Sequence, residues 1–164
     1  MGEIMKKIVC IFLLISSVVF CNWNQGDFID EFGDSIGKKY IVSNTIEGEF
    51  SNTATKDSKL FVQLLISNEN KVAIFMSEYS ENRPAEKFEG YIKAKNEEGK
   101  IYSSKVDQWN NSGGLSVYDR KDLIKFLENS KEVKFYITNK YSSRYNFVLK
   151  TQGLKEALDL LNKK

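Results

Sequence analysis

The stretch WNNSGGLSVYD, residues 109–119, combines residue types that often recognise ligands. Trp109 and Tyr118 each join a large apolar ring to a polar group, which suits contacts with sugars, peptides or protein partners. The residues between them supply hydrogen-bonding groups and a pair of glycines that permits a sharp bend. Loops on rigid sheets tend to carry function, so we predict a binding site formed by Trp109, Asn110, Asn111, Ser112 and Tyr118. The same surface would be extended by Tyr102, Tyr136, Tyr141 and Tyr145, and the alternative is that these rings pack the core and edge of a β domain.

Two groups of residues could in principle catalyse a reaction. Paired carboxylates serve as acid and base in glycosidases, and four glutamates lie close in sequence: Glu78, Glu81, Glu86 and Glu89. We expect them on a loop and on an outward strand face, where glutamates are normally solvated. A Ser-Lys pair exists at Ser103-Ser104-Lys105, but adjacent strand residues point to opposite faces, and Ser103 and Lys105 would need burial to react. We therefore predict no catalytic residue and no enzyme.

The sequence contains no histidine and only two cysteines, Cys10 and Cys21. This excludes Ser-His-Asp and Cys-His nucleophile pairs and the usual catalytic zinc sites. An acidic segment at residues 22–38 carries Asp27, Asp30 and Asp34, but their spacing does not fit the calcium-binding loop of an EF-hand. We interpret this segment as an acidic loop or short helix that packs Trp23, Phe28, Ile29 and Phe32 onto the domain edge. No metal and no cofactor are predicted.

The N-terminus has the pattern of an export signal. Lys6 and Lys7 precede 13 uncharged residues, Ile8 to Phe20, which matches the apolar region of a signal peptide and is too short to span a membrane comfortably. Two interpretations of Cys21 remain open: cleavage after Cys21, with Val19 and Cys21 as the small residues before the cut, or lipidation of Cys21 in a bacterial lipoprotein. Either one predicts an extracytoplasmic protein, periplasmic or secreted, with residues 1–21 as leader.

Charge and size limit the partners and the domain count. The formal net charge is +2, from 24 Lys and Arg against 22 Asp and Glu, so we predict no nucleic-acid partner, and membrane contact only through the leader or a lipid on Cys21. About 143 residues would remain after the leader, enough for one hydrophobic core. We expect an acidic N-terminal segment at 22–38 and a single β-rich domain at 39–164.

Alternation of apolar and polar residues predicts strands over most of that domain. The expected strands are 38–46, 59–67, 71–77, 86–95, 100–109, 132–139 and 144–150. Helical spacing predicts helices at 119–130 and from 151 to the C-terminus, capped by Asp119 and Thr151. Short turns between the strands predict a mainly antiparallel sheet. The fold class is therefore mainly β: an antiparallel sandwich or partly open barrel with one inserted helix and a C-terminal helix.

The second half of the chain also resembles a known kind of protein. The order is Trp109-x-x-Ser112, a helix containing LIKFL, a hairpin, and FVLKTQGLKEAL at 147–158. It resembles small periplasmic proteins of two related kinds, the family associated with type VI secretion operons and the invasion-associated locus B type. The likeness covers residues 40–161 in layout and the last 50 in residues. It implies a non-enzymatic exported accessory protein and transfers no catalytic residue.

Taken together, these patterns predict a binding or accessory protein of the bacterial cell envelope whose partner is an envelope protein, a glycan or a peptide. Two alternatives remain: a hydrolase that uses carboxylates alone, and a structural envelope component that assembles through an exposed strand edge. A deep pocket with two convergent acids would favour the hydrolase, and a shallow aromatic surface would favour binding.

Overall fold

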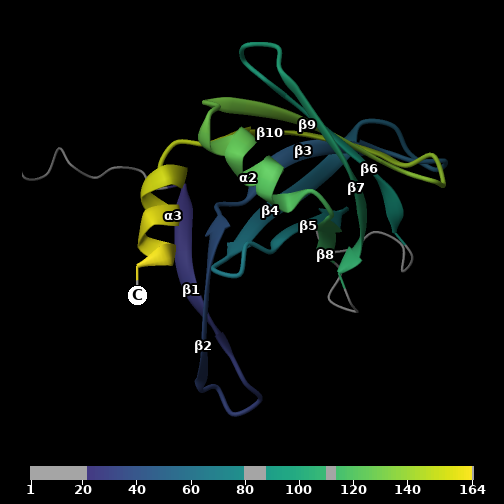
Figure 1. The fold of residues 1–164 in the computed structure, drawn as a ribbon. Helices are drawn as coiled ribbons and strands as arrows, with labels where there is room; N and C mark the ends of the chain where they lie inside the picture. The colour runs from purple at the N-terminus through teal and green to yellow at the C-terminus, as the bar shows by residue number, and fades with distance from the viewer. Residues whose placement is uncertain (1–21, 80–87, 110–113, 164) are drawn as a thin grey trace, which may run out of the picture.

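The computed structural model describes residues 22–79, 88–109 and 114–163, apart from the side chain of Trp109. This part of the chain forms ten strands and two helices (Figure 1). The strands are β1 (Trp23–Ile29), β2 (Ser35–Ser43), β3 (Ile46–Ser51), β4 (Ser58–Ser67), β5 (Val72–Glu78), β6 (Glu89–Asn96), β7 (Ile101–Trp109), β8 (Gly114–Val117), β9 (Glu132–Asn139) and β10 (Arg144–Lys150). The helices are α2 (Arg120–Glu128) and α3 (Leu154–Asn162).

Eight of the strands close into an antiparallel barrel. They follow the order β4-β3-β10-β9-β6-β7-β8-β5, and β5 pairs with β4 from Leu60↔Glu78 to Ile66↔Val72, which completes the circuit. Closure removes the edges that an open sheet would expose. The predicted class was a mainly β antiparallel sandwich or partly open barrel with an inserted helix and a C-terminal helix. The structure confirms this class and shows that the barrel is closed.

The two remaining strands extend from one edge of β4. β3 pairs with the first half of β4, and β2 pairs with its last residues through Tyr40, Ile41 and Val42. At the change of partner, the backbone N–H of Leu64 donates to the hydroxyl oxygen of Ser43 at 3.0 Å. This buried bond replaces the missing strand partner, because an unpaired buried N–H is costly.

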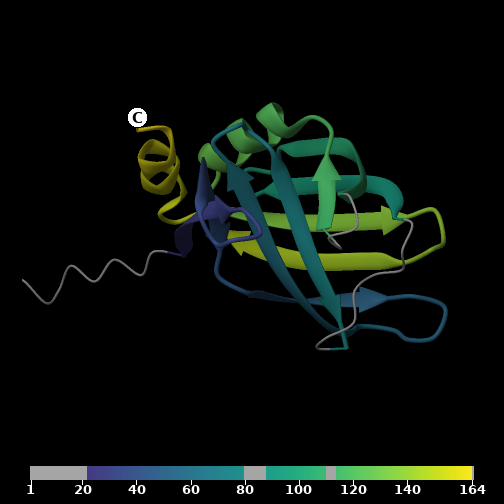
Figure 2. The same ribbon diagram turned by 90° about the horizontal axis from the view of Figure 1, so that it is seen from below.

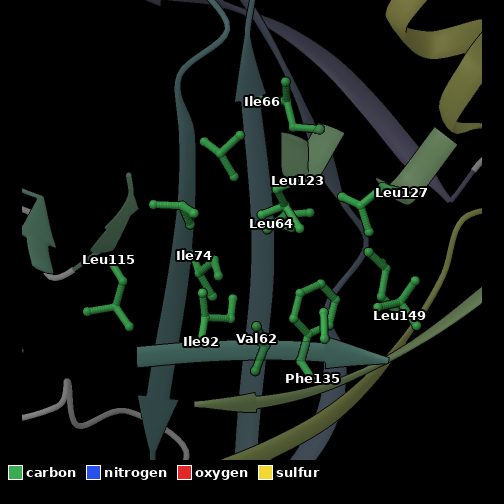
Figure 3. Packing of buried hydrophobic residues seen from close by; sticks show 14 of the residues in the cluster. Val62, Leu64, Ile66, Ile74, Ile92, Leu115, Leu123, Leu127, Phe135 and Leu149 are labelled. Atoms are coloured by element: carbon green, nitrogen blue, oxygen red, sulfur yellow. The ribbon is translucent and has the colours of Figure 1, made fainter. Parts of the chain in front are cut away.

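Side chains fill the interior of the barrel (Figure 3). Alternate residues of each strand point inward, and the inward set on β4 (Leu60, Val62, Leu64 and Ile66) is at most 1% exposed. Phe135 and Phe147 stack at 4.8 Å between ring centroids, with 13° between their planes. The interior is thus a packed core.

The helices complete this core at its margins. α2 lies across one end of the barrel (Figures 1 and 2) and buries Leu123, Ile124 and Leu127. α3 packs on β1 and β2 through the predicted stripe Leu154, Ala157, Leu158 and Leu161. The capping predictions were wrong in detail. Asp119 does occupy the N-cap position of α2, but its side chain accepts a hydrogen bond from the Ser104 hydroxyl and makes no capping bond. The N-cap of α3 is Gly153, while Thr151 donates to the Ser130 carbonyl.

The acidic segment differs from its prediction as a loop or short helix. Residues 23–43 form a β-hairpin, β1 and β2, which projects from the barrel (Figure 1). Trp23 is buried as expected, at 4% exposure. Phe28 is half-buried and packs edge-on against Tyr40 of β2, with 4.9 Å between ring centroids. Ile29 and Phe32 differ from the prediction, since they are 64% and 84% exposed at the hairpin end. Asp30 shapes that end, where its carboxylate accepts the backbone N–H groups of Phe32 and Asp34, both at 2.9 Å.

Candidate functional site

The structure places part of the predicted binding site. Tyr118 follows β8, and its side chain is 59% exposed. Trp109 ends β7, where its backbone pairs with Gly114. The other members of the prediction, Asn110, Asn111 and Ser112, lie outside the described residues, as does the lipidation candidate Cys21.

Tyr118 lines an open cleft on the outer surface of the barrel, which we name the Tyr118 cleft. Its volume is about 520 Å³, and its lining residues are Glu89, Gly90, Tyr91, Lys105, Val106, Asp107, Tyr118, Asn139 and Lys140. At Gly90 the chain passes so close to β9 that a Cβ atom would collide with the carbonyl oxygen of Thr138. The cleft draws its polar groups from β6, β7 and β9, from the turn after β9, and from Tyr118 after β8.

Two pairs of side chains are bonded to each other within the Tyr118 cleft. The Tyr118 hydroxyl donates to Asp107 Oδ2 at 2.8 Å, and Lys140 Nζ lies 2.7 Å from Glu89 Oε2. The hydrogen bond with Lys140 lowers the pKa of Glu89, and the same contact raises the pKa of Lys140. Donation to Asp107 raises the pKa of Tyr118. These groups hold one another in fixed positions at neutral pH.

A second surface, which we name the basic face, continues from the cleft across β7, β6, β9 and β10. Strand pairing sets its outward residues in rows: Lys105, Tyr91, Thr138 and Arg144; then Ser103, Lys93, Tyr136 and Asn146; then Ile101, Lys95, Lys134 and Val148. We define the basic face as Tyr91, Lys93, Lys95, Lys105, Lys134, Tyr136 and Arg144. All seven are exposed, whereas the alternate residues of these strands are buried.

Carboxylates border the basic face but make no direct ion pair with its cations among the described residues. The charge of Lys105 contributes to lowering the pKa of Glu89, after the larger effect of Lys140, and Glu97, Glu98 and Glu132 line one hollow together with Lys95 and Lys134. Within the described parts of the chain, none of Lys93, Lys95, Lys105, Lys134 and Arg144 forms an ion pair. Lys95 and Lys134 are directly opposite across β6 and β9, an arrangement of like charges that destabilises a sheet. The three rows contain five cations and no acid.

The tyrosines divide between the surface and the interior. Tyr91, Tyr118, Tyr136 and Tyr141 are 39–59% exposed, while Tyr102 and Tyr145 are buried. Two of the predicted surface residues are therefore core residues, because their strand positions point inward. Tyr91 was absent from the predicted site, although strand alternation with buried Ile92 already places it on the outer face.

The buried tyrosines give an expectation for alkaline pH. Burial raises the pKa of Tyr102 to about 12, and burial with a hydrogen bond to Glu78 raises the pKa of Tyr145. The folded protein thus keeps these phenols neutral. Their contribution to stability is full below pH 10 and declines as pH rises from 10 through 12, where the unfolded chain releases those protons first.

We expect the free energy of unfolding of wild type to fall between pH 9.5 and 11.5, measured by urea unfolding. The fall should be smaller in Y102F/Y145F than in the control Y91F/Y136F, which removes two exposed hydroxyls. Equal slopes in the two variants would show that the buried phenols ionise without unfolding.

The catalytic candidates occupy structural positions. Glu78 accepts the hydroxyl of Tyr145 at 2.7 Å, and Ser104 donates to Asp119 at 3.0 Å. Glu81 and Glu86 lie outside the described residues. Glu89 and Asp107 are directly opposite across β6 and β7, but the lowered pKa of Glu89 keeps it charged, which does not suit a general acid.

The described residues offer neither a metal-binding cluster nor a membrane-spanning helix. No cluster of three or more acidic or cysteine side chains there could hold a metal ion. No helix in residues 22–79, 88–109 and 114–163 is long and apolar enough to cross a membrane.

Comparison with known proteins found no match at any level. No family model, no curated protein and no solved structure matches this chain. The resemblance to periplasmic accessory proteins therefore stays a prediction.

Proposed function

We propose that this protein is an exported, non-enzymatic binding protein of a bacterial cell envelope, and that it binds an anionic ligand on the basic face. The observation that carries the proposal is the set of five exposed cations around Tyr91 and Tyr136, none of which forms an ion pair with a described residue. The leader-like N-terminus supports export.

The filled barrel interior supports a site on the outside. Small barrels that carry ligands internally need an open chamber, whereas here the inward side chains of β4 are almost completely buried. The outer face of β6, β7 and β9 offers exposed groups on regular strands instead. Strands hold side chains more precisely than loops do.

The cations favour a ligand with negative charge, and the tyrosine rings favour a ligand with flat apolar surfaces. A ligand that placed negative charge between Lys95 and Lys134 would relieve their mutual repulsion. The rings of Tyr91 and Tyr136 lie on neighbouring strands and offer flat apolar surfaces. A carboxylate-bearing sugar chain or an acidic peptide has both features.

A carboxylate hydrolase is less well supported. The Tyr118 cleft does bring Glu89 and Asp107 together, but each is already bonded to a neighbour, Lys140 or Tyr118. The cleft is also open to solvent rather than deep. These contacts suit binding better than proton transfer.

The test measures binding of a size-defined oligogalacturonate by calorimetry, with neutral maltooligosaccharides as the control. We expect saturable binding of the acidic chain only, weakening as salt rises from 0.05 to 0.5 M because exposed charges are screened. No binding of the acidic chain would contradict the proposal. Tighter binding of oligothymidylate would replace it with single-strand nucleic-acid recognition, which also uses cations and aromatic rings.

A further inference from the structure

The end of the β1–β2 hairpin is a second surface with exposed charged and apolar groups. Residues 22–37 contain four carboxylates and no Lys or Arg, and the first of them, Asp27, lies opposite Lys39 across the hairpin. We name the hairpin end the acidic tip and define it as Asp27, Ile29, Asp30, Glu31, Phe32, Asp34 and Ile36. Ile29, Phe32 and Ile36 are 64%, 84% and 51% exposed, which is unusual for neighbouring large apolar side chains on one projection.

The acidic tip and the basic face are complementary. One carries four carboxylates around a projecting phenylalanine, and the other carries five cations around two tyrosine rings. Among the described residues, no carboxylate of the acidic tip and no cation of the basic face forms an ion pair. These charges are therefore available to a second molecule.

The two surfaces cannot meet within one molecule. The hairpin projects on the side of the barrel away from β6, β7 and β9 (Figures 1 and 2). Its position is fixed at the base, where β2 pairs with β4 and Lys38 lies 2.9 Å from Glu69. A contact between tip and face thus requires two copies of the chain.

We propose that the partner of the basic face is the acidic tip of a second copy of this protein. This inference rests on the proposed function, since it names the anionic ligand of the same face. Each copy would donate one tip and accept another, a head-to-tail contact. Such contacts generate open chains or rings rather than closed two-fold dimers. Electrostatic attraction orients the copies, and Phe32 supplies apolar contact with Tyr91 and Tyr136.

The experiment uses protein expressed from the complete coding sequence and purified in the form that cells produce. A tip variant carries E31Q/D34N, and a face variant carries K95Q/K134Q, so that neither altered surface gains a charge that could attract the other. The control K56Q/K155Q changes two exposed lysines that lie on neither surface. Analytical ultracentrifugation then records the mass of each protein from 10 μM to 1 mM at low salt.

We expect the mass of wild type and of the control to rise with concentration and to return to one chain in 0.5 M salt. Each variant alone should remain at one chain. An equimolar mixture should stop at two chains, because it retains one intact tip and one intact face. A wild type that stays monomeric, or a tip variant that still assembles, would overturn the inference.

Binding of oligogalacturonate to the tip variant separates this inference from the proposed function. If the tip variant binds the sugar chain while wild type stays monomeric, the basic face binds anions and the second copy is not its partner. If neither binding nor assembly occurs, both proposals fail. If the tip variant binds the sugar chain and wild type self-associates, oligogalacturonate should also dissociate the wild-type oligomers, since it competes with the acidic tip for the basic face.

Discussion

Replacing Phe135 with alanine should lower the free energy of unfolding by about 3–5 kcal/mol, the usual cost of removing a large buried ring. Phe135 is 2% exposed and stacks on Phe147 in the barrel interior, beside Val62 and Ile92 (Figure 3). Small domains have about 5–15 kcal/mol of stability in total. The variant should therefore unfold at a much lower urea concentration, measured by circular dichroism.

The neighbouring substitution Y136A is the matched control, because Tyr136 points outward from the same strand. It should change stability by less than about 1 kcal/mol. A loss below about 1 kcal/mol for F135A would contradict the account, since it would mean that the barrel interior has free space. An interior with free space would be an alternative ligand site.

Replacing Lys134 with glutamate should have opposite effects on stability and on binding. The substitution converts the repulsive pair Lys95–Lys134 into an attractive one, worth roughly 0.2–1 kcal/mol on a sheet. The protein should thus become slightly more stable. Affinity for oligogalacturonate should fall at least tenfold, corresponding to about 1.4 kcal/mol or more, because one cation is lost and a repulsive charge is added.

K155E changes the net charge equally at an exposed position on α3 and is the control for this test. It should leave the affinity for oligogalacturonate within about twofold of wild type. Equal losses in K134E and K155E would mean that net charge, and not the basic face, determines binding. A K134E protein that is clearly destabilised would show that Lys134 has a structural role.

Sequence patterns predicted the regular half of the barrel well. The strands at 132–139 and 144–150 match β9 and β10 to the residue, since each alternates cleanly around short turns. No separate strand was predicted for β3, because Ile46–Ser51 has little strand preference of its own. The strand predicted at 38–46 instead ran past the end of β2 at Ser43 and into the first residue of β3. A glycine at position 48 weakens the strand pattern, yet the tertiary structure requires it, because a side chain there would collide with the backbone of β10.

The hairpin and the basic face show two further limits of sequence reasoning. A register shift between Asp27 and Ile29 interrupts the alternation of β1, so the segment resembles a loop. Alternation along the strand predicted at 86–95 is enough to place Lys93 and Lys95 on one face, but it does not identify their neighbours on β9. β6 pairs with β9 although two strands and a helix separate them in the sequence. The overall net charge of +2 also conceals the local cluster of cations that this pairing creates.

The most direct test of anion binding on the basic face is nuclear magnetic resonance of ¹⁵N-labelled tip variant titrated with oligogalacturonate. The tip variant is used because self-association would otherwise compete. We predict that amide shifts concentrate on the outer rows of β6, β7 and β9, around Tyr91, Lys93, Lys95, Lys134 and Tyr136. Saturable shifts confined to other surfaces, or no shifts at millimolar ligand, would contradict the central claim.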